Sequence, residues 1–223
     1  MTNELTKPMS AEELRAAISK AANELYLTVF SQYGKYVNPK ASLEENLYLL
    51  LSEQNQLAFQ TRVKRRVRVA GFPQTKTMEM FQMTKDILPN LNFDEVNELA
   101  TCKFIDDKID VCAFSPSGHG KTHLALAIGY EAIKRGYTVR FRRASDLINE
   151  MAEAQSEKKL SDYIRLMTRC ALLIVDEVGY FDYDAAASSL LFQIIGARYE
   201  TGSTFYTSNQ TNPNLNKIQT FSI

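Results

Sequence analysis

The segment Ser115–Thr122 (SPSGHGKT) contains residue types that bind phosphate, at the spacing that this chemistry needs. An apolar run precedes the segment and a helix-forming run follows it. A strand, a glycine-containing loop and a helix that starts at Lys-Thr form a phosphate-binding loop, because the loop N–H groups and the helix dipole both face an anion. We therefore predict that Lys121 contacts the β- and γ-phosphates of ATP and that Thr122 places its hydroxyl on Mg²⁺. The predicted cofactor-binding residues are Ser117, Gly118, His119, Gly120, Lys121, Thr122 and Asp176.

Ser115 occupies the place of the first glycine in the usual pattern G-x-x-x-x-G-K-[ST]. A serine fits this turn when its φ is negative and resists a positive φ. An ordinary strand–turn–helix with a chance Gly-Lys-Thr is therefore the alternative interpretation.

A pair of carboxylates supports the nucleotide interpretation. They follow the apolar run Cys170–Val175, which is typical of a strand buried on both faces of a parallel sheet. Ligands of such sheets bind at the carboxyl ends of the strands, where Asp176 and Glu177 fall. We predict that Asp176 holds Mg²⁺ together with Thr122. Glu177 points to the other face and is the predicted catalytic residue that polarises the attacking water.

The segment Gly202–Asn209 predicts a further strand that ends in polar residues. Asn209 is the second predicted catalytic residue, and Thr207 or Ser208 is an alternative for contact with the γ-phosphate or water. A small-molecule or nucleotide kinase would share this loop, but adjacent carboxylates suit water activation better than transfer to another acceptor.

A dense basic run ends a long predicted helix that begins at the capping box Ser42–Glu45 and stops at Gly71. Five cations lie within seven residues: Arg62, Lys64, Arg65, Arg66 and Arg68. No carboxylate lies nearby in the sequence to neutralise them. We predict that this run contacts the phosphates of double-stranded DNA, and a solvated helix face is the alternative.

The order of the elements predicts two domains, a helical DNA- or partner-binding region at residues 1–88 and an α/β core at residues 89–223. Helical spacing from the capping box Ser10–Glu13 to Tyr33 predicts the first helix. Strands alternate with helices from Val111 onward, which predicts a parallel sheet flanked by helices.

Two finer predictions concern helices of the second region. Asp94–Ile105 is expected to be one helix that leads into the first strand. Ser145 is expected to cap the helix that follows the second strand.

Composition adds little to these assignments. The 223 residues carry a formal net charge of zero, so overall charge neither supports nor excludes nucleic acid. The three cysteines show no C-x-x-C pair and are expected to be free thiols. The absence of a signal-like or membrane-spanning run predicts a cytoplasmic protein without a membrane partner. His119 and His123 have helical spacing, but no cysteine or carboxylate joins them, so a metal site there is disfavoured.

The chain resembles the IstB/DnaC family of AAA+ ATPases, and IstB-type transposition helpers more than DnaC-type helicase loaders. The matching segments are SPSGHGKTHLA at Ser115–Ala125, GYEAIKRGYTVRF at Gly129–Phe141, ASDLIN at Ala144–Asn149, LLIVDEVGY at Leu172–Tyr180 and LFQIIGARYE at Leu191–Glu200. The resemblance implies Walker A at Gly118–Thr122, Walker B at Asp176 and Glu177, and sensor 1 at Asn209. It also implies ATP-driven homo-oligomerisation on DNA with a transposase as partner. A helicase loader, with a replicative helicase as partner, is the alternative.

The family pattern continues after sensor 1 with an arginine finger and a fifth strand, whereas only Gln210–Ile223 follow here. The C-terminal end of the core is therefore expected to be missing and ATP hydrolysis to be weak. The strand Val111–Phe114 is then expected at the edge of the sheet, unless Gln219–Ile223 covers it. Arg198 precedes sensor 1 and is expected to pair with Glu200 or solvent.

Overall fold

The computed structural model describes residues 9–82, 92–178, 184–209 and 219–222. The chain divides into two compact units, Met1–Arg62 and Val63–Ile223. The division lies inside a long helix rather than at residue 88, because Val63 and Ala70 near the end of this helix belong to the core of the second unit. Independent folding of the two predicted domains stays a prediction. In the described ranges, no helix is long and apolar enough to cross a membrane.

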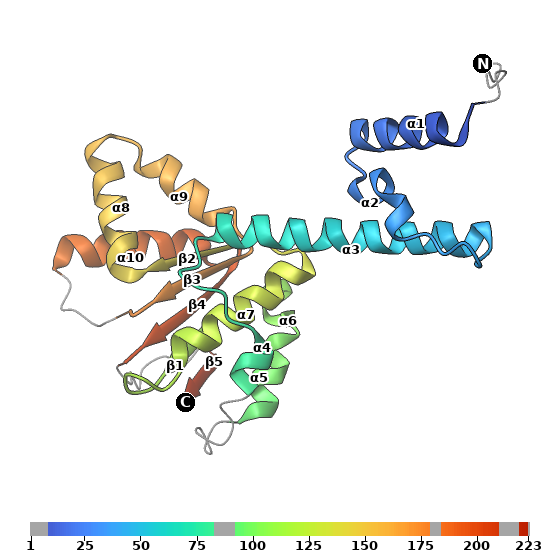
Figure 1. Ribbon diagram of the computed structural model, residues 1–223. Coiled ribbons are helices and arrows are strands. Elements are labelled where there is room, and N and C mark those ends of the chain that lie inside the picture. Colours follow the sequence, from blue (N-terminus) through green and yellow to red (C-terminus); the bar gives the residue numbers. More distant parts are fainter. Residues whose placement is uncertain (1–8, 83–91, 179–183, 210–218, 223) are drawn as a thin grey trace. The chain divides into compact units, whose positions relative to one another are not determined.

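The first unit is helical (Figure 1). It contains α1 (Ala11–Glu24), α2 (Thr28–Ser31), the 3-10 helix η1 (Tyr33–Lys35) and the larger part of α3 (Leu43–Ala70). Both predicted capping boxes are confirmed, since the hydroxyls of Ser10 and Ser42 accept bonds from the backbone N–H groups three residues later, and the glutamates bond back. The prediction that the first helix reaches Tyr33 is wrong. The helix ends at Glu24, and Tyr26 has a left-handed φ of 58° that a right-handed helix cannot include.

A five-stranded parallel sheet forms the centre of the second unit, in the order β2-β3-β4-β1-β5. The strands are β1 (Val111–Phe114), β2 (Val139–Arg143), β3 (Leu172–Asp176), β4 (Ser203–Ser208) and β5 (Gln219–Ser222). Because all five strands run in one direction, the residues that follow β1, β3 and β4 meet at one end of the sheet.

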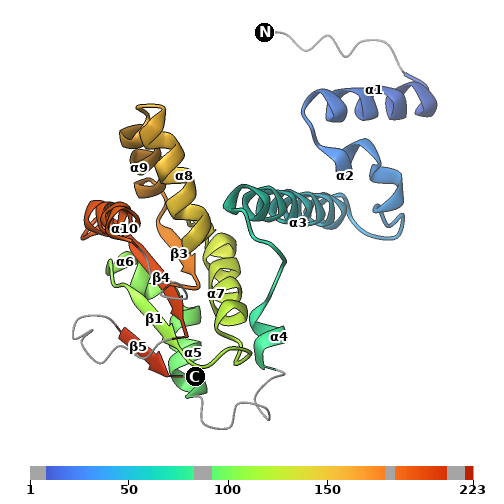
Figure 2. The same ribbon diagram turned by 90° about the vertical axis from the view of Figure 1, so that its left-hand side faces the viewer.

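Helices cover both faces of this sheet (Figures 1 and 2). One face packs against α5 (Phe93–Ala100), α6 (Lys103–Asp106), α7 (Lys121–Arg135), α4 (Met78–Gln82) and the end of α3. The other face packs against α8 (Ala144–Ser156), α9 (Leu160–Thr168) and α10 (Ala185–Arg198). Leu172 and Ile174 of β3 belong to the core between the sheet and α7, and Leu173 and Val175 belong to the core between the sheet and α8. The predicted α/β class is confirmed.

The predicted loss of the fifth strand is wrong. Gln219–Ser222 forms β5, which pairs in parallel with β1 from Val111↔Gln219 to Phe114↔Ser222. The alternative prediction, that the last residues cover β1, is thereby confirmed for these four residues. In the described part of the sheet, β1 is an inner strand with β4 on its other side.

Two helix predictions in this unit are also wrong. The predicted helix Asp94–Ile105 is divided into α5 and α6, because Cys102 adopts a left-handed φ of 62° between them. The helix α8 begins at Ala144, one residue before the predicted cap Ser145, and its N-cap residue Arg143 makes no side-chain capping bond.

Candidate nucleotide-binding site

The glycine loop connects β1 to α7. Gly118 and Gly120 have φ values of 86° and 82°, in the left-handed region where glycine is favoured, and Gly120 is the N-cap residue of α7. Ser115 is not among the described residues with positive φ, so the departure from the usual motif introduces no backbone strain. Its N–H group donates to the carbonyl of Ser208 in β4 at 3.3 Å, which attaches the start of the loop to the sheet.

Lys121 lies under this loop. Its Nζ donates to the carbonyl oxygens of Ser115 at 2.6 Å and Pro116 at 2.9 Å, and reaches the Ser115 hydroxyl at 3.3 Å. Burial lowers the pKa of Lys121, and the negative charges of Asp176 and Glu177 partly oppose that effect. A phosphate in the loop would add a negative charge where the ammonium has lost hydration, so this position favours an anionic ligand.

Thr122 and Asp176 are in direct contact. The Thr122 hydroxyl donates to Asp176 Oδ1 at 2.8 Å, although the two residues are separated by 54 positions in the sequence. Hydroxyl and carboxylate oxygens are the hard donors that Mg²⁺ prefers, so the pair fits this ion. No group of three His, Cys, Asp or Glu residues in the described ranges could hold a metal. A bound Mg²⁺ would therefore take its remaining ligands from phosphate and water.

The predicted opposite placement of Asp176 and Glu177 agrees with their surroundings. Asp176 is buried, whereas Glu177 is exposed and has a left-handed φ of 62°. The Glu177 N–H group donates to Thr207 Oγ1 at 2.9 Å. Asn209 is half-buried and directly follows β4, at the same end of the sheet as the loop after β1. The catalytic roles of Glu177 and Asn209 stay predictions.

The two histidines have different surroundings. His119 is exposed, with Nδ1 close to the carbonyl oxygens of Pro116 at 3.2 Å and Ser117 at 3.1 Å. His123 packs edge-on against Phe81 with ring centroids 5.4 Å apart, and burial lowers its pKa. Ser117 is exposed at the tip of the loop with His119, where both side chains are open to solvent.

The basic run lies on α3. Arg62, Lys64, Arg65 and Arg68 are exposed, and Arg66 is half-buried. The ion pairs among the described residues are Lys134–Glu131, Arg142–Glu150 and Lys159–Glu157, so none of them involves the run. The Arg62 guanidinium lies 5.8 Å from the centroid of the Phe59 ring, on the same helix. These side chains are therefore available to an anionic ligand.

One residue differs from its expected role, and another makes contacts that the sequence did not predict. Arg198 is fully buried and does not pair with Glu200 or solvent; its guanidinium donates to Thr204 Oγ1 and to carbonyl oxygens that include those of Met167 and Ser203. These hydrogen bonds connect the end of α10 to β4. Thr207, an alternative to Asn209 for contact with the γ-phosphate or water, also bonds to Asp176 and Glu177. A threonine near a strand end gives no sequence signal for such contacts.

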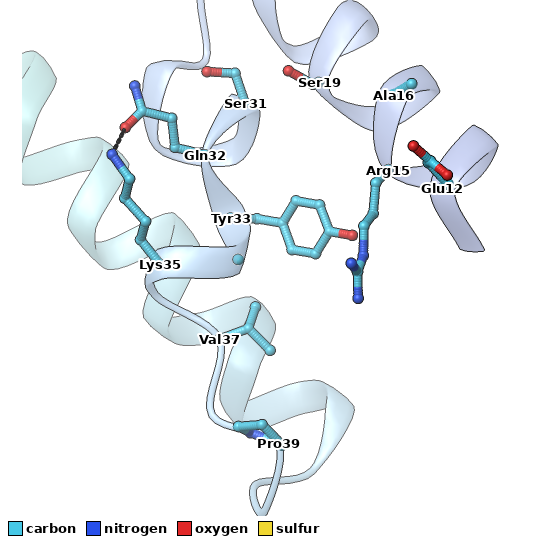
Figure 3. A pocket seen from close by; sticks show the side chains of 11 residues that line it. Glu12, Arg15, Ala16, Ser19, Ser31, Gln32, Tyr33, Lys35, Val37 and Pro39 are labelled. Atoms are coloured by element: carbon cyan, nitrogen blue, oxygen red, sulfur yellow. Dashed lines mark hydrogen bonds between the residues drawn. The ribbon is translucent and has the colours of Figure 1, made fainter.

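The first unit contains a pocket of about 740 Å³ between α1 and the segment after α2 (Figure 3). Arg15 and Tyr33 line it from opposite sides, and Lys35 at its border donates to Gln32 Oε1 at 2.7 Å. The lining combines Glu12 with two cations, so its charge does not select one class of ligand.

The loop after β1, the carboxylates after β3 and the strand order define an AAA+ P-loop nucleotide-binding fold. Residues 19–219 match the family model described as IstB-like ATP binding protein. The chain belongs to the family of IstB-like ATP-binding proteins.

Its relatives include ATP-binding proteins of insertion sequences. One, of IS5376 from Geobacillus stearothermophilus, is 34% identical over 89% of this chain and 80% of its own length. Another, of IS21 from Pseudomonas aeruginosa, is 31% identical over 89% of this chain and 74% of its own length. Similar solved structures include AMPPCP-bound DnaA from Aquifex aeolicus (23% identity, TM-score 0.47, 54% of this chain and 39% of that one). The DnaC helicase loader is also similar (22% identity, TM-score 0.45, 63% of this chain and 76% of that one).

Proposed function

We propose that this chain is an ATP- and Mg²⁺-dependent helper of transposition that acts on double-stranded DNA together with a transposase. The observation that carries the proposal is the direct bond between Thr122 and Asp176 beside the buried Lys121. Family membership supports ATP as the nucleotide, and the insertion-sequence relatives favour a transposase over a replicative helicase as partner.

The nucleotide part of the proposal assigns a role to each element of the site. The loop Ser117–Gly120 surrounds the phosphates, Lys121 neutralises them, and Thr122 and Asp176 hold Mg²⁺. When bound, Mg²⁺ would neutralise charge on the β- and γ-phosphates. Glu177 polarises water near the γ-phosphate, and Asn209 orients that water or contacts the phosphate.

The DNA part rests on the basic run of α3. Four of its cations are exposed, and none of the five is in an ion pair with a described residue. Such side chains can displace counterions from DNA phosphates without first breaking a salt bridge. We further propose that ATP promotes self-association of the chain on DNA, which sedimentation with and without ATP would measure.

The nucleotide site is tested by replacing Lys121 with alanine and measuring ATP affinity by calorimetry. We expect Lys121→Ala to weaken Mg-ATP binding by about 10- to 100-fold, since a charge-assisted bond to phosphate contributes about 1.5–3 kcal/mol. Lys134→Ala is the matched control, because Lys134 lies on the same helix and pairs with Glu131 at 2.9 Å. Unchanged ATP affinity of the Lys121 variant would show that the site assignment is wrong.

The partner is tested by a pull-down of the chain with the transposase of its own insertion sequence and, in parallel, with the replicative helicase of the host. We expect retention of the transposase in the presence of ATP and DNA. Retention of the helicase alone would replace the proposed role with that of a helicase loader.

A further inference from the structure

We infer that Thr207 is a positioning residue of the nucleotide site: its one hydroxyl holds both the carboxylate of Asp176 and the backbone of Glu177. The inference rests on the proposed function, because it concerns the residues assigned there to Mg²⁺ and water. Thr207 lies outside the phosphate-binding loop and the carboxylate pair, and it is a different residue from Asn209.

The position of Thr207 follows from the sheet. β4 lies between β3 and β1, and the ladder between β3 and β4 reaches Val175↔Tyr206. The next residues along the two strands are Asp176 and Thr207, so their side chains meet where the ladder ends. Thr207 is 1% exposed and Asp176 is 3% exposed, which means that water does not compete for their contact.

The hydroxyl of Thr207 makes two hydrogen bonds of opposite direction. It donates to Asp176 Oδ1 at 2.5 Å and accepts from the Glu177 N–H group at 2.9 Å. A threonine hydroxyl has one proton and two lone pairs, so both bonds can exist at once. When one hydroxyl both donates and accepts a hydrogen bond, each bond polarises the O–H group in the sense that strengthens the other. The two bonds are therefore expected to be cooperative.

The bond to Asp176 completes a chain of contacts across the site. Asp176 Oδ1 also accepts from the Thr122 hydroxyl at 2.8 Å, so α7, β3 and β4 are joined at one oxygen atom. Two fixed donors on Oδ1 restrict the rotation of the carboxylate and leave Oδ2 for another ligand. A carboxylate held in this way is already oriented before a metal or its water arrives.

The bond to Glu177 acts on the backbone. Glu177 has a φ of 62°, a conformation that non-glycine residues adopt only when their surroundings require it. Thr207 supplies two acceptors to this turn, its hydroxyl to the Glu177 N–H group and its carbonyl to the Val178 N–H group at 2.8 Å. One threonine therefore holds the buried carboxylate of Asp176 and the backbone turn that carries the exposed Glu177.

The first test uses the protein without nucleotide and follows amide hydrogen exchange by NMR. Thr207→Val keeps the shape of the side chain and removes the hydroxyl, so the Glu177 amide loses its acceptor while the Val178 amide keeps the Thr207 carbonyl. We expect exchange at Glu177 to become at least tenfold faster and exchange at Val178 to change less than threefold. Thr207→Ser retains the hydroxyl and should restore slow exchange at Glu177.

The second test measures the ratio of the ATP dissociation constants without and with Mg²⁺. We expect this ratio to fall at least fivefold in Thr207→Val and to stay within twofold of wild type in Thr207→Ser. Thr204→Val is the matched control, because it removes a buried hydroxyl of the same strand that instead accepts from Arg198 Nε at 3.1 Å. It should leave both the ratio and the exchange at Glu177 unchanged.

The outcomes separate the inference from the proposed function. A wild-type ratio in Thr207→Val, equal acceleration at both amides, or failure of the serine variant to restore slow exchange would overturn the positioning role alone. An equal loss in the Thr204 variant would reduce Thr207 to a general structural residue. A wild-type chain whose ATP affinity does not respond to Mg²⁺ would overturn the proposed site and this inference together.

Discussion

The nucleotide site and the basic run of α3 are both predicted to meet phosphate, but they are built in opposite ways. In the nucleotide site, Lys121, Asp176 and Thr207 are buried. Lys121 is held by carbonyl groups of the loop before it, and Asp176 by hydroxyl groups from α7 and β4. In the basic run, the side chains are mostly exposed and follow one another along a single helix. One arrangement depends on the tertiary structure, and the other depends on local sequence and helical geometry.

This difference has a consequence for mutations. A change in the packing beneath the nucleotide site should alter stability and ATP binding together, because the site residues are fixed by the sheet and its helices. A change in the basic run should act through charge alone, roughly in proportion to the number of cations removed. Each of the following variants tests one side of this contrast.

The largest expected effect is on DNA binding by the triple variant Arg62→Gln, Arg65→Gln and Arg66→Gln. Each phosphate contact contributes about 0.9 to the slope of log affinity against log salt concentration, so loss of three contacts should make the slope shallower by about 2 to 3. Fluorescence anisotropy with a DNA duplex at several salt concentrations measures this slope. ATP affinity should stay within twofold of wild type.

The matched control removes three exposed lysines of the second unit, Lys103→Gln, Lys108→Gln and Lys158→Gln. The change in formal charge is the same, so the control separates the position of the cations from the net charge of the protein. An equal loss of slope in both triple variants would mean that the run is an ordinary solvated helix face, which was the alternative interpretation of the sequence.

A smaller effect is expected from Gly129→Ala beneath the nucleotide site. Gly129 lies in α7, and a Cβ atom there would come within 2.7 Å of Ile174 Cδ1 and 2.8 Å of Phe72 Cζ. Overpacking outweighs the gain in helix propensity, so we expect a net destabilisation of about 1–2 kcal/mol. The melting temperature should fall by about 2–8 °C. ATP affinity should weaken at the same time, because α7 carries Lys121 and Thr122.

Gly196→Ala provides the control for Gly129→Ala. Gly196 lies inside α10, and a Cβ atom there would meet no atom within 4 Å. Alanine should raise the melting temperature slightly, because it favours the helix without a clash. A Gly129→Ala variant with wild-type stability would show that Ile174 and Phe72 move aside at little energetic cost. The packing beneath the nucleotide site would then not couple stability to ATP binding.

The sequence was sufficient to predict the elements whose signals are local. The strand that ends at Asp176 was recognisable because four successive apolar residues, Leu172–Val175, are buried before the carboxylate. The glycine loop was recognisable because Gly118 and Gly120 occupy backbone conformations that favour glycine. In both cases a single local requirement, burial in the strand or a left-handed backbone in the loop, selects the residue types.

The features that were missed, or predicted only as an alternative, depend on contacts between distant segments. β5 has only four residues and is specified by its pairing with β1 rather than by a long apolar run. Arg198 has the composition of a surface residue, and only the carbonyl groups that converge on it explain its burial. The bond between Thr207 and Asp176 spans 31 positions, so no sequence pattern could have indicated it.

The smallest expected effect concerns Asp110, whose Oδ1 accepts from the Thr204 N–H group at 2.6 Å just before β1 begins. Burial raises the pKa of Asp110, and the bond from Thr204 and the charge of Arg198 partly oppose that effect. Because the folded protein then holds this proton more tightly than the unfolded chain, the contribution of Asp110 to stability falls as the pH rises through its folded pKa. Asp110→Asn keeps an acceptor and removes this dependence.

We therefore expect the Asp110→Asn variant to melt at most about 2 °C higher than wild type at pH 7, as for a substitution worth about 0.5 kcal/mol. The difference should shrink as the pH is lowered toward the usual range for a carboxyl group, which calorimetry between about pH 7 and 4 would show. ATP affinity should not change, because Asp110 precedes β1 whereas the loop follows it. A variant that loses ATP binding would show that the site depends on the opposite end of the sheet as well. The nucleotide site would then depend on the whole length of β1, which the basic run of α3 does not.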